Sequence, residues 1–175
     1  MPNAVFPPLR PRPQRRTLKV KARLRHDDGV ERYEIEDGFG LRLRYGSAEV
    51  RRETHGVVRV RYDGGITSEV CDAVAAFVDA EIARAGKLAF FIDAEQMKSY
   101  DSGFRKRWTQ WLSERRSSLT CVRLLVTSRV VQMGITIVNP LVGNNLEAHT
   151  DRQSFERALA KARAGVLSSI EQGRL

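Results

Sequence analysis

The sequence predicts an α/β protein in which helices pack on a mixed, mostly parallel sheet that is preceded by extra N-terminal antiparallel strands. Three observations support this fold class. Residues 17–50 alternate between apolar and charged residues and contain turn signals, as in antiparallel strands with one polar face. Two later runs, Leu88–Ile92 and Val122–Val126, are almost entirely apolar, as in strands covered on both faces. Between and after these runs, apolar residues recur at helical spacing, and such strand–helix repetition is typical of helices layered on a sheet.

The N-terminal segment differs in composition from the rest of the chain. The net charge is +9, but residues 1–25 hold eight basic residues and no acidic one, whereas the remainder, with 22 basic and 21 acidic residues, is nearly neutral. Five of the six prolines also lie in this segment. We therefore expect residues 1–16 to form a disordered or extended tail. The basic arm of this segment comprises Arg10, Arg12, Arg15, Arg16, Lys19 and Lys21.

Two interpretations of the basic arm stay open. A cluster of Lys and Arg can bind the phosphates of nucleic acid or an anionic membrane. The simpler interpretation is a solvated tail, which is favoured by the lack of interleaved aromatic residues on which bases could stack. Salt-dependent binding that disappears when residues 1–25 are deleted would distinguish the first interpretation from the second.

Composition limits the class of protein. A length of 175 residues suits one domain with attachments. No apolar run approaches the ~18 residues of a membrane span, and the N-terminus lacks the apolar core of a signal peptide, so we expect a cytoplasmic protein. The two cysteines, Cys71 and Cys121, are too few for a disulfide framework and too isolated for a metal site, and both suit small core positions.

Motifs for catalysis are lacking. The chain contains no Gly-x-Ser-x-Gly elbow, P-loop, dinucleotide fingerprint or metal-ligand helix. His26, His55 and His149 are scattered, and none has an evident carboxylate or nucleophile as a partner. We therefore expect a non-catalytic protein without a cofactor or a bound metal.

The segment after the tail is expected to form the additional strands. Apolar residues alternate with charged or polar ones in three stretches, residues 18–24, 33–35 and 41–45. Turn signals at Asp27–Gly29 and Asp37–Gly38 separate these stretches. Short antiparallel strands joined by tight turns are the predicted structure.

Helices and apolar strands alternate in the following part. A strand over residues 57–62 ends at residues 63–65, and Thr67 or Ser68 can cap the helix that follows. That helix has a stripe of apolar residues at i, i+3, i+4 spacing and stops at Gly86, where a left-handed cap residue is expected. The stripe comprises Val70, Cys71, Val74, Phe77, Val78 and Ile82.

The second half of the chain repeats this pattern. A buried strand over residues 88–92 leads through a polar loop to a helix over residues 102–116, and another buried strand follows at residues 122–126. We also expect a short helical turn and a strand within residues 129–138. The last helix begins at the capping-box pattern of residues 150–153. Its inward residues are predicted to be Phe155, Leu159, Ala162, Val166 and Ile170.

The segment Leu88–Phe104, LAFFIDAEQMKSYDSGF, holds the most distinctive motif of the chain. An apolar strand ends in Asp93, and Asp101-Ser102-Gly103 opens the next helix. The pattern thus places a serine at a helix N-terminus, where free amides and the helix dipole favour negative charge.

About residues 50–160 resemble a STAS domain, the fold of bacterial anti-sigma-factor antagonists and of the cytoplasmic part of sulfate transporters. Four pieces carry the resemblance: VVRVRYDGGITSEV, FFIDAEQMKSYDSG, LLV with the later MGITIV, and DRQSFERAL. Together they extend over about 60% of the chain. The resemblance implies a diverged STAS-like α/β domain over residues 51–172, with additional strands at residues 17–50.

In antagonists of this family a partner kinase phosphorylates the serine before the glycine. The resemblance therefore implies Ser102 as a phosphorylation candidate, and it implies a protein partner, either a kinase or an anti-sigma-like regulator. Basic side chains nearby can form charge-assisted hydrogen bonds with a phosphate. The residues expected to support this site are Asp93, Lys98, Asp101, Gly103, Arg105 and Lys106.

The motif departs from the family pattern around its serine. The family usually has two serines before the glycine and small residues after it, whereas this chain has Asp101 before Ser102, and residues 104–107 are Phe-Arg-Lys-Arg. Bulk and positive charge therefore stand where small residues would let a partner approach, which argues against an ordinary anti-sigma kinase. The simpler interpretation of Ser102 is a helix N-cap, which needs only its hydroxyl.

Three aromatic residues of the same helix, Phe104, Trp108 and Trp111, are interface candidates. Their spacing with Leu112 favours packing inside the monomer over a partner surface. A hydrophobic small molecule or lipid is an alternative ligand if this helix faces the last helix across a cavity. The edge of the additional strands also needs a partner or a cover, which makes a homodimer an alternative arrangement.

Overall fold

The computed structural model describes residues 24–25, 30–127 and 145–171 of the 175-residue chain. The described residues form eight strands and three helices. The strands are β1 (Leu24–Arg25), β2 (Glu31–Ile35), β3 (Gly38–Arg42), β4 (Gly46–Thr54), β5 (Val57–Ile66), β6 (Leu88–Tyr100), β7 (Leu119–Leu125) and β8 (Leu146–His149). The helices are α1 (Glu69–Ala85), α2 (Ser102–Glu114) and α4 (Arg152–Glu171).

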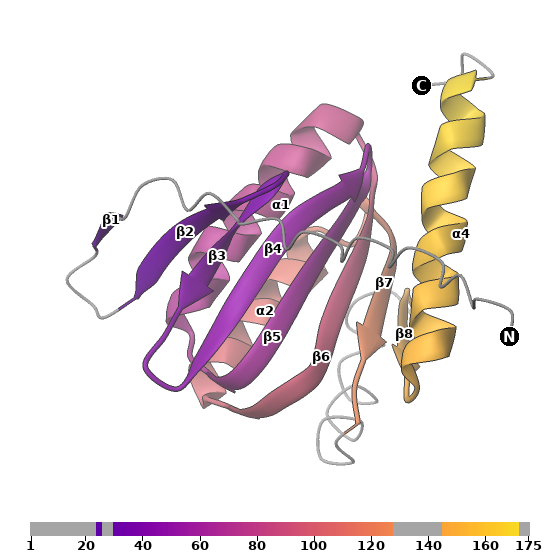
Figure 1. Cartoon of the computed structure of the whole chain (residues 1–175). Coiled ribbons are helices and arrows are strands. Elements are labelled where there is room, and N and C mark those ends of the chain that lie inside the picture. The colour runs from indigo at the N-terminus through magenta and orange to yellow at the C-terminus, as the bar shows by residue number, and fades with distance from the viewer. Residues whose placement is uncertain (1–23, 26–29, 128–144, 172–175) are drawn as a thin grey trace, which may run out of the picture.

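All of these strands belong to one sheet, in which the spatial order β1 to β8 is the order along the chain (Figure 1). Strands β1 to β5 pair antiparallel with their neighbours, and β5 to β8 pair parallel. The fold class predicted from the sequence is therefore confirmed: a mixed sheet with parallel strands and packed helices, preceded by antiparallel strands.

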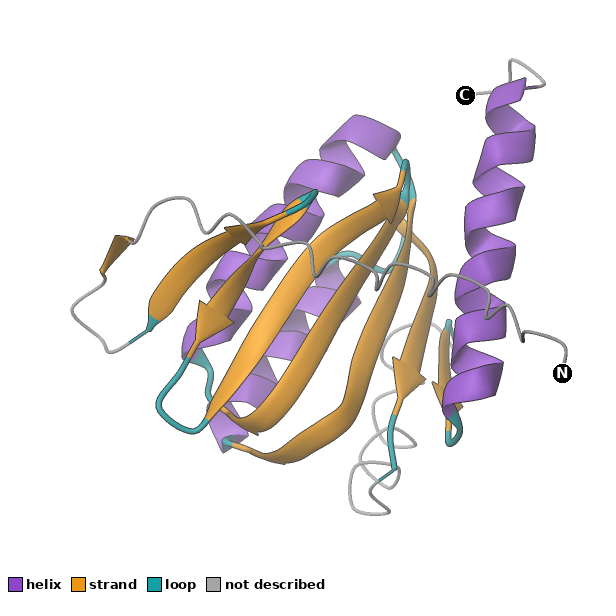
Figure 2. Ribbon diagram, in the orientation of Figure 1, coloured by secondary structure: helices purple, strands orange, loops and turns teal. Residues whose placement is uncertain are grey.

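The helices are divided between the two faces of the sheet. Helices α1 and α2 lie side by side on one face, behind the sheet in Figure 2, whereas α4 packs near β7 and β8 on the other face. Among the described residues, no helix is long and apolar enough to cross a membrane.

Two hydrophobic cores result from this division. The larger core joins β3 to β8 with α1 and α2, and it includes Val60 of β5 and Phe90 of β6. The smaller core lies under α4, where Phe91 of β6 packs edge-on against Phe155 of α4 with ring centroids 5.6 Å apart. Neighbouring residues of β6 thus face different helices, which explains why residues 88–92 are apolar without alternation.

Two strands are longer than the sequence pattern predicts. β6 continues through residues 93–100, which were expected to form a polar loop, and β5 continues through residues 63–65 to Ile66. The two extensions pair with each other. Their register shifts between Arg61 and Asp63 and again between Gly64 and Gly65 of β5. Gly64 has a φ of +75°, and a Cβ there would lie 2.4 Å from the Tyr45 carbonyl oxygen, so glycine permits the close approach of the β3–β4 loop.

The additional strands are present, with shifted ends. The turn at Asp37–Gly38 is confirmed, and Asp37 has a φ of +57°. The strand predicted to reach residue 45 ends at Arg42, and Tyr45 is 72% exposed in the following loop. The expected strand at residues 18–23 and the turn at residues 27–29 lie outside the described residues.

The end of α1 and its buried stripe agree in part with the prediction. Gly86 follows α1 with the expected positive φ, +73°, but its ψ of −47° lies outside the left-handed helical region. Of the predicted stripe, Val70, Cys71, Val74 and Val78 are buried, while Phe77 and Ile82 are half-buried. The polar residue Glu81 is also buried, which was not predicted; its carboxylate accepts a hydrogen bond from Arg84.

The last helix is capped by Asp151 rather than Thr150. The Asp151 carboxylate accepts a hydrogen bond from the Ser154 amide at 2.8 Å. Phe155 and Leu159 are buried as predicted, and Ala162 and Val166 are half-buried against them, whereas the side chain of Ile170 lies outside the described part. The predictions for residues 129–138 also lie outside it, and β8 was not predicted.

Candidate functional site

Ser102 is the first residue of α2, and its neighbour Asp101 is the helix N-cap. Asp101 is extended (φ −80°, ψ 164°), and its carboxylate accepts hydrogen bonds from the Phe104 amide at 2.6 Å and from the Ser68 amide at 2.9 Å. The interpretation of Ser102 as the cap is therefore wrong, because Asp101 performs that role. The Ser102 side chain is exposed.

The carboxylate of Asp101 joins the beginnings of both helices on its face of the sheet. Its hydrogen bonds from the backbone amides of Phe104 and Ser68 lower the pKa of Asp101, because they favour the charged form. The N-terminus of α2 therefore already holds one negative charge directly beside the Ser102 hydroxyl.

Gly103 permits the close contact between the two helix ends. A Cβ at this position would lie 3.1 Å from both Cβ and Oγ of Ser68, and 3.2 Å from an Asp101 carboxylate oxygen. The glycine thus keeps the start of α2 against the start of α1, and it leaves Ser102 on the outer side of this junction.

Exposed basic residues surround Ser102. Lys98 lies near the end of β6, and Arg105 and Lys106 lie in the first turns of α2, all exposed. Within the described part of the chain none of these three forms a salt bridge, whereas the next residue, Arg107, pairs with Asp72 of α1. Besides Asp101, the first turn of the adjacent α1 contributes the exposed acidic residues Glu69 and Asp72, and Asp72 is the partner of Arg107.

The three aromatic interface candidates lie in the larger core. Phe104, Trp108 and Trp111 are each less than 10% exposed. The Phe104 ring packs on Tyr62 with centroids 5.3 Å apart, and Trp108 and Trp111 pack on Phe90 at 5.7 and 5.9 Å. The structure thus places these side chains inside the monomer, not on a surface open to a partner.

The expected cavity between α2 and the last helix has no place in this fold. Helix α2 packs on one face of the sheet and α4 on the other, so the sheet separates them. This corrects the premise on which the hydrophobic-ligand alternative rested.

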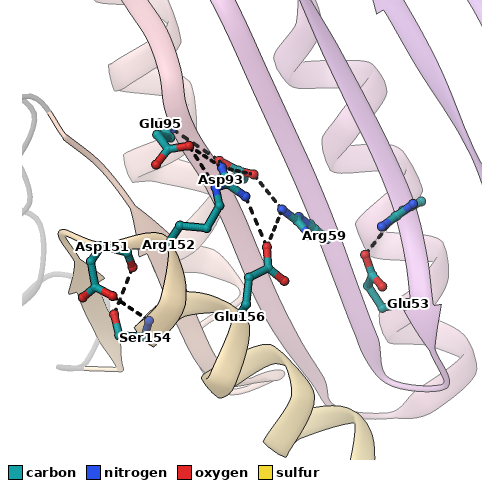
Figure 3. Close-up of polar contacts among 9 residues, drawn as sticks. Glu53, Arg59, Asp93, Glu95, Asp151, Arg152, Ser154 and Glu156 are labelled. Carbon is teal, nitrogen blue, oxygen red and sulfur yellow. Dashed lines mark hydrogen bonds and ion pairs between the residues drawn. The ribbon is translucent and has the colours of Figure 1, made fainter.

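A second polar site lies where α4 meets the sheet (Figure 3). Asp93, 1% exposed at the end of the apolar part of β6, accepts hydrogen bonds from Arg59 of β5 at 2.7 Å and from Arg152 of α4 at 2.9 and 3.0 Å. Glu156 also accepts from both arginines, at 3.0 and 3.2 Å, and Glu95 accepts from Arg152 at 2.7 Å. We call these five residues the α4 clamp.

The charges of the α4 clamp stabilise one another. Burial by itself raises the pKa of Asp93, but the hydrogen bonds and positive charges of Arg59 and Arg152 outweigh it, so the pKa lies below its usual range. Asp93 had been predicted to support the Ser102 site; instead it holds α4 against β5 and β6.

Sequence reasoning missed the other members of the α4 clamp. Arg59 belongs to an alternating strand, and Arg152 and Glu156 to a helix start, where charged residues are ordinarily solvated. One signal was available: a carboxylate that ends a strand buried on both faces is almost never without a cationic partner.

The remaining predicted residues do not gather at either site. The basic arm, Arg10, Arg12, Arg15, Arg16, Lys19 and Lys21, lies outside the described residues. His149 is buried at the end of β8 with Nδ1 3.0 Å from the Ser154 hydroxyl, and His55 lies in the β4–β5 turn. In residues 24–25, 30–127 and 145–171, no group of three or more His, Cys, Asp or Glu side chains is suited to a metal.

No protein-family model and no curated protein matches the sequence. Among solved structures, the chain is similar to an uncharacterised protein of the DUF3478 family with a SpoIIAA-like fold, from Shewanella loihica PV-4. The TM-score is 0.53 at 10% sequence identity, and the alignment covers 67% of this chain and 96% of that one.

Two structures of SpoIIAA are also similar to the chain. The cell-fate determinant SpoIIAA of Bacillus in its phosphorylated form has a TM-score of 0.48 and 14% identity, covering 63% of this chain and 98% of that one. The anti-sigma factor antagonist SpoIIAA in its unphosphorylated form has a TM-score of 0.46 and 16% identity, covering 65% and 96%.

The chain therefore has a SpoIIAA-like fold, the diverged STAS-like architecture expected from the sequence. At these identities the similarity defines the fold alone. In this chain the sheet begins with the antiparallel strands β1 to β4.

Proposed function

We propose that the protein is a non-catalytic signalling module that docks a protein partner through the beginning of α2, and that phosphorylation of Ser102 switches the docking. One observation carries the proposal: the Ser102 side chain is exposed at the first position of α2, while Asp101 alone caps the helix. Ser102 can thus be modified without removing a hydrogen bond that the fold needs.

The charge of a phosphate would act on the surface rather than on the fold. A phosphoserine carries about −1.5 to −2 charges near neutral pH. Because the Asp101 carboxylate already occupies the Phe104 amide, a phosphate on Ser102 would be repelled by Asp101 and directed outward, toward Lys98, Arg105 and Lys106. These three positive charges would then be largely neutralised, and a surface suited to an acidic partner would lose its attraction.

The modification itself would be the work of a partner kinase. The Ser102 Oγ would form a bond to the γ-phosphorus of ATP as the bond to the ADP oxygen breaks, and the hydroxyl proton would pass to a base of the kinase. The partner that the proposal requires is a kinase or an anti-sigma-like regulator with an acidic docking surface.

Phosphate mapping tests the proposal. The purified chain is incubated with ATP and an extract of its native cells, and modified peptides are identified by mass spectrometry. We expect phosphate on Ser102 in the natural chain and in the control Ser99→Ala, because Ser99 is an exposed serine three residues away. Ser102→Ala should carry none, and natural protein without phosphate on Ser102 would refute the switch.

A binding comparison tests the docking surface separately. Partners retained by the Ser102→Ala chain should be lost from Ser102→Asp and from Arg105→Glu, since both changes reduce positive charge at the start of α2. A Lys87→Glu control makes the same reversal of charge at an exposed position at the far end of α1. Equal retention by all four chains would show that the start of α2 is not the docking surface.

A further inference from the structure

The sheet face that carries α4 contains a pocket of about 120 Å³. Four side chains of β4 and β5 line it, namely Glu49, Arg51, Arg59 and Arg61. Arg59 places the pocket beside α4, because its guanidinium donates to Glu156 and lies 5.6 Å from the centre of the Phe155 ring. Ser102 begins a helix on the opposite face, so this pocket is separate from the proposed docking surface.

The strand register brings positive charges together in the pocket. In the β4–β5 ladder Arg51 lies directly opposite Arg59, and Glu49 lies directly opposite Arg61. Like charges directly opposite on one sheet face destabilise the pairing. Carboxylates outside the cross-strand pair offset part of this repulsion, because Glu53 pairs with Arg51, and Asp93 and Glu156 pair with Arg59.

Most hydrogen-bond donors of these arginines are unused. Within the described part of the chain, Arg51 donates through Nε alone, to Glu53, and Arg59 donates through one terminal nitrogen alone, to Asp93 and Glu156. Arg61 forms no hydrogen bond or salt bridge with a described side chain and is exposed. Since each guanidinium has five N–H donors, the pocket presents a surplus of donors with fixed directions.

Glu49, the single carboxylate among the residues that line the pocket, forms a hydrogen bond with a residue outside it. Its Oε1 accepts a hydrogen bond from the Tyr33 hydroxyl at 2.8 Å, and the Tyr33 ring lies across Gly40 of β3. Among the four lining residues, three guanidinium groups therefore stand against one carboxylate, while Glu53 beside the pocket pairs with Arg51, and Asp93 and Glu156 pair with Arg59. Arg59 is also held in position, because only 13% of its side chain is exposed and the α4 clamp fixes one end of its guanidinium.

From this geometry we infer that the pocket binds a dianionic phosphoryl group, either free phosphate or the phosphate of a small monoester. Paired arginine forks match the oxygens of a phosphate and bind it through parallel hydrogen bonds. A phosphate between Arg51 and Arg59 replaces their repulsion with two attractive contacts. The volume holds one such group, and the open sheet face leaves room for the rest of an ester outside the pocket.

Calorimetric titration of the full chain in chloride buffer tests this inference. The two probes are inorganic phosphate and glycerol 3-phosphate, and saturable binding of at least one is expected. Binding of both identifies a site open to monoesters, and binding of phosphate alone identifies a site for the free ion. Without saturable binding of either probe, the inference fails.

Matched variants locate the site. Arg51→Gln and Arg61→Gln should each weaken binding by about tenfold or more, as expected for the loss of charged hydrogen bonds. Arg42→Gln removes the same charge from an exposed arginine of β3 on the same face and should change affinity less than twofold. Thermal unfolding without phosphate verifies that each variant is folded. Equal weakening by all three substitutions would overturn the inference, because it would indicate only general attraction to positive charge.

Discussion

The α4 clamp predicts a large effect of one atom-for-atom substitution, Asp93→Asn. Asparagine has nearly the same shape as aspartate, but it offers one acceptor oxygen where the Asp93 carboxylate accepts three contacts from the two arginines, at 2.7, 2.9 and 3.0 Å. Its amide N–H groups would face a guanidinium, which has only donors. Either Arg59 or Arg152 therefore loses its buried partner, and the side chain at position 93 cannot turn toward water because Asp93 is 1% exposed.

The magnitude follows from what is lost and what remains. Removing one partner from a buried ion pair costs about 3–5 kcal/mol. Glu95 and Glu156 still accept from the two arginines, and Arg152 is 39% exposed, so part of the loss is offset by the remaining partners and by water. We therefore expect the free energy of unfolding to fall by about 2–4 kcal/mol.

Urea unfolding measures this loss. Far-UV circular dichroism reports on α4 and the sheet, and the fluorescence of the buried Trp108 and Trp111 reports on the opposite face. Asp63→Asn is the control, since Asp63 is an exposed aspartate of β5 without a salt bridge to any described residue, and its effect should stay within about 0.5 kcal/mol. A loss below about 1 kcal/mol for Asp93→Asn would refute the view that Asp93 organises the clamp.

Three further predictions concern acid stability and the larger core. Because the pKa of Asp93 is lowered, Asp93 binds a proton less tightly in the native state than in the unfolded chain. The ionised Asp93 therefore stabilises the native state above about pH 4, and this stabilisation is lost as the pH falls through the native pKa. Asp93→Asn should consequently flatten the acid limb of stability against pH, and an unchanged limb would contradict this. Asp101→Ala should lower the free energy of unfolding by about 1–2 kcal/mol, whereas Ser102→Ala should stay within about 0.5 kcal/mol; the reverse order in urea unfolding would show that Ser102 is the cap. Tyr62→Phe should leave stability unchanged or raise it by up to about 1 kcal/mol, because the buried Tyr62 hydroxyl has no hydrogen-bond partner among the described residues, and a lowered melting temperature would oppose this.

The fold could be predicted from the sequence because burial differs between its two kinds of strand. β2 to β4 lack a helix on one face for most of their length, so apolar and polar residues alternate along them. Residues 88–92 of β6 are covered on both faces and are therefore apolar throughout. Helix α1 is buried along one side only, so its apolar residues recur at helical spacing and could be recognised in the sequence.

The end of β6 could not be predicted because its pattern depends on distant partners. Residues 95–99 are polar except for Met97, as a loop would be, but the backbone continues to pair with the glycine-containing end of β5. Backbone hydrogen bonds are open to any residue type except proline as donor, so the side chains carried little information about this pairing.

The candidate sites show a similar limit. Asp101 and Ser102 are both good N-cap residues, and only the extended backbone at Asp101 distinguishes the cap from the first helical residue. For the α4 clamp, Asp93 pairs with residues 34 positions before and 59 positions after it. A charge at the end of a strand indicates that a partner is needed, but the sequence contains many arginines at such distances.

The order of strands in the sheet has a consequence for how the chain folds. Because each described strand pairs only with those next to it along the chain, none of the described strands has to be inserted between two that have already paired. The hairpins β2–β3, β3–β4 and β4–β5 close over short turns, and the first parallel crossover needs only α1. Local closure lowers the entropic cost of pairing and favours fast folding. During synthesis the sheet can therefore grow at one edge in the order of translation, and the α4 clamp is completed last, after the other face has acquired its helices.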